Sequence, residues 1–501
     1  MNKQTSSGIL RNVAYGSAAW LLPLALGFVA TPLIVYSLGV ADYGIYALIV
    51  GFIGYSFTFA IGRAITKYIA EFRATGESEK IREVISATLL INLGVGIAGI
   101  LLVYLSADWL VADLLRIDTS LASKAVQALH ISAFVIFLTM CTQAFSAVLQ
   151  GLHRFDVYAK IANAASLALV GGNVVLAWQG FDLNALLVWC LITTFLSTVA
   201  FAVAARKLLP EFGFRLKIDK DIWRLVFKYS SGVVGYQILA NLILLFERGW
   251  ITRRLGPEAL TFYAVPMTLG MYVHALVGSL VLVIFPLASE LKDDLNRLER
   301  LYLKATKVIC SVVVFLVTTL IVIREPFLSV YLGTDFAAAS SDVLVLHALS
   351  FGCAAVLAIT WQMTEGLGHP NFNFKVFALC AALCIPLMIV LINPLGSFGV
   401  GIARLVGFGT IFFSIFYVEK WIFGSVRLRF WLRLLVMIAA AGVAAAIVES
   451  VIVASLERAW STIIYALTAG AAVYGLVLWL VGFVTEDEHA LVRSILRRRN
   501  A

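Results

Sequence analysis

Long apolar runs recur through the whole of this 501-residue chain, and they limit its possible folds more than any other feature. Each run holds about twenty residues, enough for a helix to cross the hydrocarbon core of a bilayer. None shows the strict alternation of apolar and polar positions that marks a transmembrane β-barrel. The chain is therefore predicted to be an all-α polytopic membrane protein with 14 transmembrane helices. The predicted spans are 13–37, 44–70, 84–106, 125–148, 159–179, 183–205, 229–252, 260–288, 305–324, 342–364, 375–393, 398–419, 433–454 and 461–484.

An internal repeat organises these spans. The segment 38–47, LGVADYGIYA, returns as 255–264, LGPEALTFYA, at an offset of 217 residues. The same offset relates 114–134 to 331–351, with identical residues at eight positions, and a slip of two residues then aligns Lys160 with Lys375. Similarity at a constant offset indicates a duplication.

The repeat predicts how the chain is divided. Six spans in each half return the chain to the side where it began, so the two halves have the same orientation. Such a parallel repeat is predicted to enclose a cavity between its halves. The predicted parts are an N-terminal six-helix bundle (1–205), a cytoplasmic linker (206–228), a second six-helix bundle (229–420), and two additional transmembrane helices with a basic cytoplasmic tail (421–501).

The charges are interpreted as a topology signal. The formal net charge is +9, but 61% of the residues are hydrophobic and the mean hydropathy is +0.95. That composition is too apolar for a soluble protein, and no basic face outside short loops indicates a nucleic-acid partner. Lysine and arginine gather in segments on one side, including 206–228 and 493–499. Both termini are therefore predicted to be cytoplasmic.

No catalytic motif is found in the sequence. It lacks a GxxxxGK[ST] loop, an HExxH pair and a nucleophile elbow. The longest polar loop has about twenty residues, too few for an independent glycosyltransferase domain. The six cysteines lie in apolar runs without neighbouring histidines or carboxylates, which favours free thiols over a metal site. The chain is predicted not to be an enzyme and to need no cofactor.

Charged residues inside the spans are the candidates for function, because a charge at membrane depth is costly and usually faces a cavity. The candidates are Arg63 and Lys67 in the second span, Glu247 and Arg248 in the seventh, and Arg404 in the twelfth. The four cations predict a substrate-binding cavity of positive potential. Such a cavity suits an anionic ligand such as a pyrophosphate, whose oxygens accept charge-assisted hydrogen bonds.

Other interpretations of these residues stay open. Lys67 lies near a span end and could extend its ammonium to the lipid surface. Arg248 could be neutralised by Glu247, or Glu247 could pair with Arg404. Glu247 and His274 are also candidates for ion coupling or gating, since histidine titrates near neutral pH.

Two further lysines begin spans on the cytoplasmic side. Lys160 and Lys375 occupy matching positions of the repeat. A lysine at a helix start opposes the helix dipole, so another interaction is expected to keep it there. Contact with lipid headgroups is one explanation, and contact with cargo at a cytoplasmic entrance is the other.

Together, the two six-helix halves, the motif Leu-Gly-x-x-x-Tyr-Gly-x-Tyr at 38–46 and the two extra helices resemble a known family. They are similar to the O-antigen and exopolysaccharide repeat-unit flippases of the multidrug/oligosaccharidyl-lipid/polysaccharide (MOP) superfamily. Thr261 departs from the motif, because the first copy has Gly44 there, and this departure is expected to weaken the second hinge.

The resemblance implies a function. The protein would move an undecaprenyl-pyrophosphate-linked glycan unit from the cytoplasmic to the outer leaflet of the bacterial inner membrane by alternating access. The polyprenyl tail would stay in the lipid. Expected partners are this lipid-linked glycan, membrane lipids, and a polysaccharide polymerase with its chain-length machinery.

Three other functions are alternatives to this one. A lipid II flippase would share the fold and span count, but basic residues in the first span would favour it and 13–37 has none. A cation-coupled multidrug antiporter would have twelve spans and acidic residues in its N-terminal cavity. A membrane-embedded glycosyltransferase or polymerase would need a sizeable polar loop with carboxylates.

Overall fold

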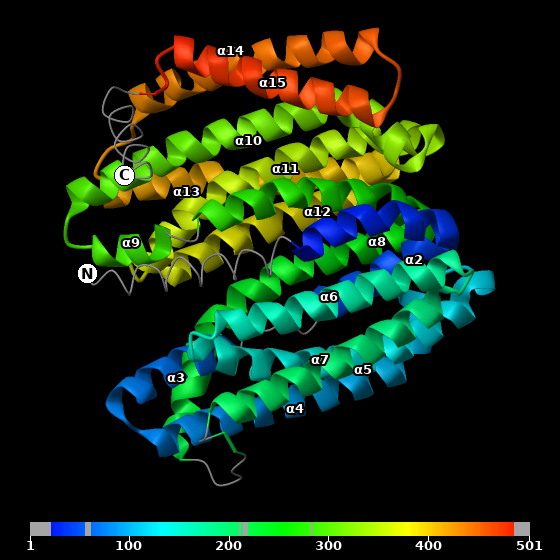
Figure 1. Cartoon of the computed structure of the whole chain (residues 1–501), viewed down its shortest axis with the longest axis vertical. Coiled ribbons are helices and arrows are strands. Elements are labelled where there is room, and N and C mark those ends of the chain that lie inside the picture. The colour runs from blue at the N-terminus through cyan, green and yellow to red at the C-terminus, as the bar shows by residue number, and fades with distance from the viewer. Residues whose placement is uncertain (1–21, 56–61, 210–211, 214–218, 282–283, 485–501) are drawn as a thin grey trace, which may run out of the picture. The chain divides into compact units, whose positions relative to one another are not determined.

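The computed structural model describes residues 22–55, 62–209, 212–213, 219–281 and 284–484 (Figure 1). Within these ranges the regular structure is entirely helical, which confirms the all-α prediction. In the described part of the chain, ten helices are long and apolar enough to cross a membrane, and two shorter apolar helices are Leu22–Leu38 and Val40–Tyr55. The chain is therefore a multi-pass membrane protein.

Contacts divide the chain into two compact units. Unit 1 comprises Met1–Val265 and Pro370–Ala403, and unit 2 comprises Pro266–His369 and Arg404–Ala501. Unit 1 contains Leu22–Leu38, α2 (Val40–Tyr55), α3 (Gly62–Thr75), α4 (Ser78–Trp109), the π-helix η1 (Leu110–Leu114), α5 (Thr119–Gly151), α6 (Phe155–Trp178) and α7 (Leu183–Leu208). Unit 2 contains α9 (Ile284–Glu290), α10 (Leu295–Leu332), α11 (Thr334–Gly366), α13 (Ile411–Tyr417), the π-helix η2 (Val418–Ile422), α14 (Leu428–Ser455) and α15 (Trp460–Leu480). Two helices, α8 (Lys220–Val281) and α12 (Pro370–Phe408), are each divided between the two units.

Glycines break the two longest helices. α8 has 62 residues, about 93 Å at 1.5 Å per residue, which is far more than a bilayer needs. It leaves helical geometry at Gly256 (φ 88°), and α12 does so at Gly396 (φ 58°). Both breaks fall between two predicted spans. The count of fourteen spans and the boundaries at 205, 228 and 420 stay predictions.

Left-handed backbone recurs at matching positions of the repeat. The pairs are Gly39 with Gly256, Arg116 with Gly333, and His153 with Gly368, and all six residues have positive φ. Such values suit glycine and are uncommon for arginine or histidine. Turns of the same unusual geometry at equivalent places are what a duplicated chain would retain.

The two copies of the repeated hinge lie against each other in unit 1. The Thr261 hydroxyl of the second hinge donates to the carbonyl of Val40 in the first, at 2.6 Å. A Cβ added to Gly44 would lie 2.5 Å from the carbonyl carbon of Pro257 and 3.0 Å from Oγ1 of Thr261. The hydroxyl of Thr261 joins the two hinges, and the expectation that this residue weakens the second hinge stays a prediction.

Replacing Gly44 by alanine is expected to destabilise the protein, because the new methyl group would overlap backbone that cannot rotate away. Overpacking of this kind costs about 1–3 kcal/mol. Gly94 on α4 provides a matched control, since a Cβ there meets nothing within 4 Å. Thermal unfolding of the purified variants should show a lower midpoint for Gly44→Ala and an unchanged or higher one for Gly94→Ala. Equal midpoints would contradict the close hinge contact.

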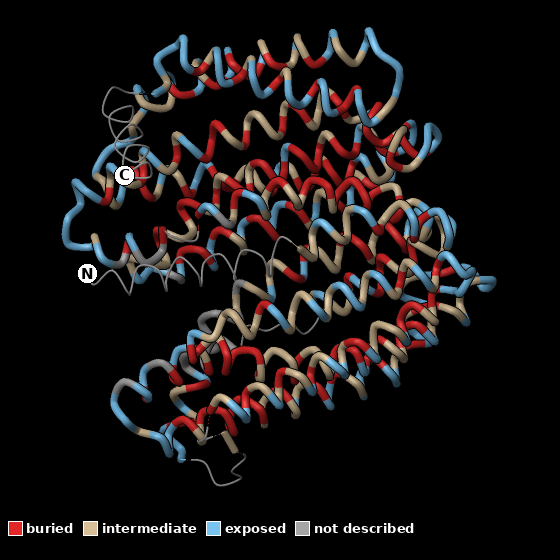
Figure 2. The backbone as a smooth tube through the Cα atoms, in the orientation of Figure 1, coloured by how far each residue is buried: buried red, intermediate tan, exposed pale blue. Residues whose placement is uncertain are grey.

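Burial differs strongly between helices of unit 2. In the most apolar 18-residue segment of α11, 67% of the residues are buried, whereas the corresponding segments of α14 and α15 are each 28% buried (Figure 2). α11 is therefore a central helix of this unit, while α14 and α15 present apolar side chains outward. α14 and α15 pack on each other and on α10 (Figure 1).

Candidate functional site

Arg248 on α8 is buried against the small-residue face of α2. Its side chain is 6% exposed, and Nη1 donates to the carbonyl of Ala47 at 2.9 Å. Its guanidinium lies 5.6 Å from the centre of the Tyr55 ring. Gly51 leaves room for it, since a Cβ at that position would lie 2.7 Å from Cδ of Arg248. The α2 sequence therefore shapes a slot for this cation.

The arginine keeps some of its hydrogen-bonding capacity. Among the described residues, the buried Nε of Arg248 has no hydrogen-bond partner. A guanidinium has five N–H donors in a planar fork that fits phosphate and carboxylate groups. A buried donor without a partner is rare in folded proteins and calls for an explanation, such as a ligand or water.

Glu247, the neighbour of Arg248, is fully buried. The hydroxyl of Tyr263 donates to its Oε1. Tyr263 matches Tyr46 in the repeat, so the second hinge supplies this partner directly. Successive helical residues point about 100° apart, which directs Glu247 and Arg248 toward different neighbours.

Arg404 is a second buried cation, on α12 and in unit 2. It is 1% exposed, and its guanidinium lies 5.2 Å from the ring of Phe351 and 6.0 Å from that of Phe408. Nη2 is 3.9 Å from the sulfur of Met267. Aromatic faces stabilise a cation that has lost water.

The remaining candidate residues have different surroundings. Arg63 belongs to α3, but its side chain lies outside the described part of the structure. Lys67 is exposed, with Nζ 4.8 Å from the ring of Tyr68. His274 on α8 is partly buried and bonds to the backbone of Ala354 on α11.

Both matching lysines, Lys160 on α6 and Lys375 on α12, are exposed near the first turns of their helices. Because the buried cations fall in different units, their common cavity stays a prediction. So do the roles of Arg63, Lys67, Glu247, His274, Lys160 and Lys375.

Two buried carboxyl groups in unit 2 were missed in the sequence. Glu419 and Glu449 are fully buried and fall within the predicted spans 398–419 and 433–454. The predicted spans therefore contain two buried carboxyl groups in addition to Glu247. A complete count of ionisable residues in every predicted span would have found both.

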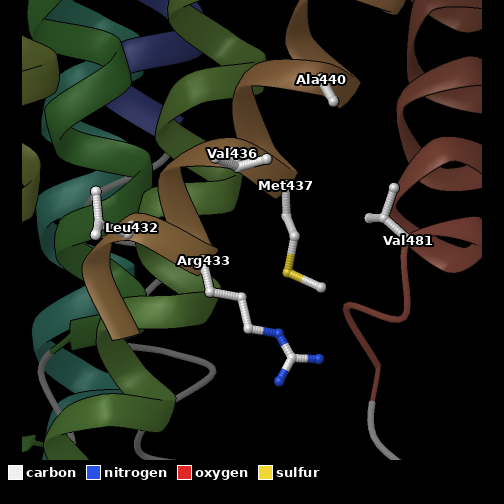
Figure 3. Close-up of a pocket in the computed structure, with 6 residues that line it drawn as sticks. All are labelled: Leu432, Arg433, Val436, Met437, Ala440 and Val481. Atoms are coloured by element: carbon white, nitrogen blue, oxygen red, sulfur yellow. The ribbon is translucent and has the colours of Figure 1, made fainter. Parts of the chain in front are cut away.

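A groove of about 480 Å³ lies between α14 and α15 (Figure 3). Arg433 and Met437 extend into it from α14, and Val481 faces it from the end of α15 (Figure 3). Its other lining residues are Leu432, Val436 and Ala440. The groove is mainly apolar and carries one cation, so it does not form a polar headgroup site.

Comparison with known proteins decides the family. The sequence profile described as polysaccharide biosynthesis protein matches residues 33–341. The chain belongs to this family. A putative O-antigen transporter of Shigella flexneri is 20% identical over 401 residues, which cover 79% of this chain and 94% of that protein. The resemblance inferred from the hinge and the repeat is thereby confirmed.

Solved structures place this polysaccharide biosynthesis protein in a shared fold. The lipid II flippase MurJ, in an inward closed conformation, matches with a TM-score of 0.72 and 14% identity, covering 93% of this chain and 98% of that one. An inward-facing multidrug resistance MATE transporter of the MOP superfamily has a TM-score of 0.62 and 14% identity, covering 84% and 94%. The fold is thus that of MOP-superfamily membrane transporters.

Proposed function

We propose that the protein is a flippase that moves a polyprenyl-pyrophosphate-linked oligosaccharide from the cytoplasmic to the outer leaflet of the inner membrane. Its cargo would be an O-antigen or exopolysaccharide repeat unit. Membership of the polysaccharide biosynthesis family and the MOP-superfamily fold support transport of this class of molecule. The name of the Shigella relative supports the O-antigen type.

Arg248 is the observation that carries the proposal. A buried guanidinium costs free energy unless charge and hydrogen bonds compensate it, and its Nε has no hydrogen-bond partner among the described residues. A pyrophosphate supplies both compensations, and exclusion of water strengthens the attraction. Arg404, also buried, would provide a second cation, with Arg63 and Lys67 completing a positive cavity.

The proposed layout is fourteen spans, arranged as six, six and two, with both termini in the cytoplasm. The glycine breaks in α8 and α12 support it, because each divides one long helix between two spans. Alternating access would then expose the cavity to one leaflet at a time. Lys160 and Lys375 would meet cargo or lipid headgroups at the cytoplasmic entrance.

The energy source is proposed to be an ion gradient or the cargo gradient. Glu247 and His274 are titratable and buried or partly buried, which suits coupling or gating. Downstream, a polysaccharide polymerase with its chain-length machinery would consume the exported units.

A lipid II flippase is the second candidate, favoured by the fold match over 93% of this chain. The sequence of 13–37 argues against it, since no basic residue stands in this first predicted span. A multidrug antiporter suits the buried arginines poorly, because they would repel a cationic drug.

Reconstituted transport tests the proposed function. The purified chain in liposomes should move a fluorescent undecaprenyl-pyrophosphate-linked glycan across the bilayer without ATP, under an ion gradient or the cargo's own gradient. Accessibility of the glycan to an impermeant enzyme would report its movement. The unlabelled undecaprenyl-pyrophosphate-linked glycan should compete with the fluorescent one for transport, while lipid II should compete weakly. Strict dependence on ATP, or stronger competition by lipid II, would contradict the proposal.

A further inference from the structure

Glu449 is an isolated carboxyl group between α10, α14 and α15. Its side chain is fully buried, and Oε1 lies 2.7 Å from the hydroxyl of Thr319 on α10. Within the described residues, Oε2 has no hydrogen-bond partner. Gly470 on α15 makes room for the group, because a Cβ there would overlap the carboxyl.

The carboxyl lies beside the middle of α15, far from both ends of that helix. α15 has 21 residues, so it is about 31 Å long, which is close to the thickness of the hydrocarbon core. Gly470 is the middle residue of that helix, about 15 Å from either end. In a helix that crosses the bilayer along its whole length, the group that touches Gly470 would lie near the centre of the hydrocarbon core.

No cation lies near it in the sequence of the three helices. The apolar part of α10 has no lysine or arginine between Lys307 and Arg324, and α14 has none after Arg433. α15 contains no charged residue. The other titratable side chains in the apolar parts of these helices are Cys310 of α10 and Tyr465 and Tyr474 of α15. The hydroxyl of Tyr474 donates to the backbone carbonyl of Ser311.

Glu419 provides a comparison within the same unit. It accepts hydrogen bonds from Nε1 of Trp431 at 2.6 Å, the backbone N–H of Arg427 at 2.7 Å and the hydroxyl of Tyr302 at 3.1 Å. Several donors of this kind stabilise an ionised carboxylate. Among the described residues Glu449 has one donor, Thr319, and a carboxylate with so little compensation is strongly disfavoured in hydrocarbon.

We propose that Glu449 is a proton-binding site, and that its bound proton keeps α14 and α15 attached to α10. A protonated carboxyl needs no cation, and its hydrogen bond to Thr319 can run in either direction. Loss of the proton would place an uncompensated negative charge in the hydrocarbon core and separate α14 and α15 from α10. This site lies outside the proposed cargo cavity, so it stands or falls independently of the transport function.

Infrared spectroscopy tests the proton directly. At about pH 7 the wild-type protein should show the C=O stretching band of a protonated carboxyl, and Glu449→Gln should lack that band. Glutamine has nearly the same shape and no charge, so this variant should keep the wild-type thermal midpoint near pH 6. Glu325→Gln is the matched control, because Glu325 on α10 is 54% exposed and paired with Arg458. It should retain the band.

The response to pH gives a second measurement. Raising the pH from about 6 to about 9 should lower the thermal midpoint of the wild type more than that of Glu449→Gln. An unchanged carboxyl band in Glu449→Gln, or equal pH responses, would overturn the proposal. A Glu449→Gln protein as unstable as Glu449→Ala would also overturn it. Stabilisation by Na⁺ at constant pH would assign the site to a metal cation instead.

Discussion

Replacing Arg248 by alanine is expected to abolish glycan export while the protein still reaches the membrane. The change removes the buried guanidinium and leaves a charge of the cargo unpaired. Losing one partner of a buried charge pair costs about 2–5 kcal/mol, equivalent to a fall of roughly 30- to 5,000-fold in transport. The measurement is surface glycan in a strain lacking the native gene, complemented with each variant at equal protein level.

Three further variants identify the cause. Arg248→Lys should recover part of the activity, because it keeps the charge and loses the planar fork. Gly51→Val should reduce export although the arginine remains, since the new side chain would enter the space that Arg248 occupies. Arg458→Ala removes a 54% exposed cation and should have no effect. Normal export by Arg248→Ala would leave the arginine as a packing group and contradict the cationic cavity.

Replacing Glu419 by alanine is expected to release α14 from the rest of unit 2. The substitution leaves the half-buried indole N–H of Trp431, the backbone N–H of Arg427 and the buried hydroxyl of Tyr302 without their acceptor. Each unsatisfied group costs about 1–3 kcal/mol, so the total is on the order of 3–5 kcal/mol or more. The steady-state protein level should fall, and proteolysis should begin near the start of α14.

Glu299 offers a matched control for that experiment. It pairs with Nε of Arg427 at 2.5 Å but is 23% exposed, so water can replace part of the lost interaction. Glu299→Ala should therefore destabilise the protein much less than Glu419→Ala. Equal losses would show that the ion pair, and not the buried donors, holds the start of α14.

The fold class followed from the sequence because hydrocarbon imposes length and composition directly on each span. The hinge was equally informative, since Gly39 and Gly256 keep the same positive φ in both copies. The repeat in the sequence could not predict how the two copies of the hinge pack against each other. The hydrogen bond from Thr261 to Val40 depends on how two distant segments meet, and a sequence pattern contains no such distance.

The candidate site was predicted in part. Charges in apolar runs pointed to Arg248 and Arg404, and both are buried. Their immediate partners were not foreseeable, because Ala47 contributes a carbonyl that every residue has and Gly51 contributes only space. Glu449 shows the opposite failure, since its signal was present in the sequence and only its interpretation required Thr319 and Gly470.

α14 contacts α10 through two buried carboxyl groups. Trp431 and Tyr302 share Glu419 near one end of α14, and Glu449 accepts from Thr319 farther along the helix. Two separated attachments limit sliding of α14 along α10. In any conformational cycle, α14 and α15 should therefore move together with α10 as one rigid body. The helices should then bend elsewhere, and the non-helical backbone at Gly256 and Gly396 provides two hinge positions.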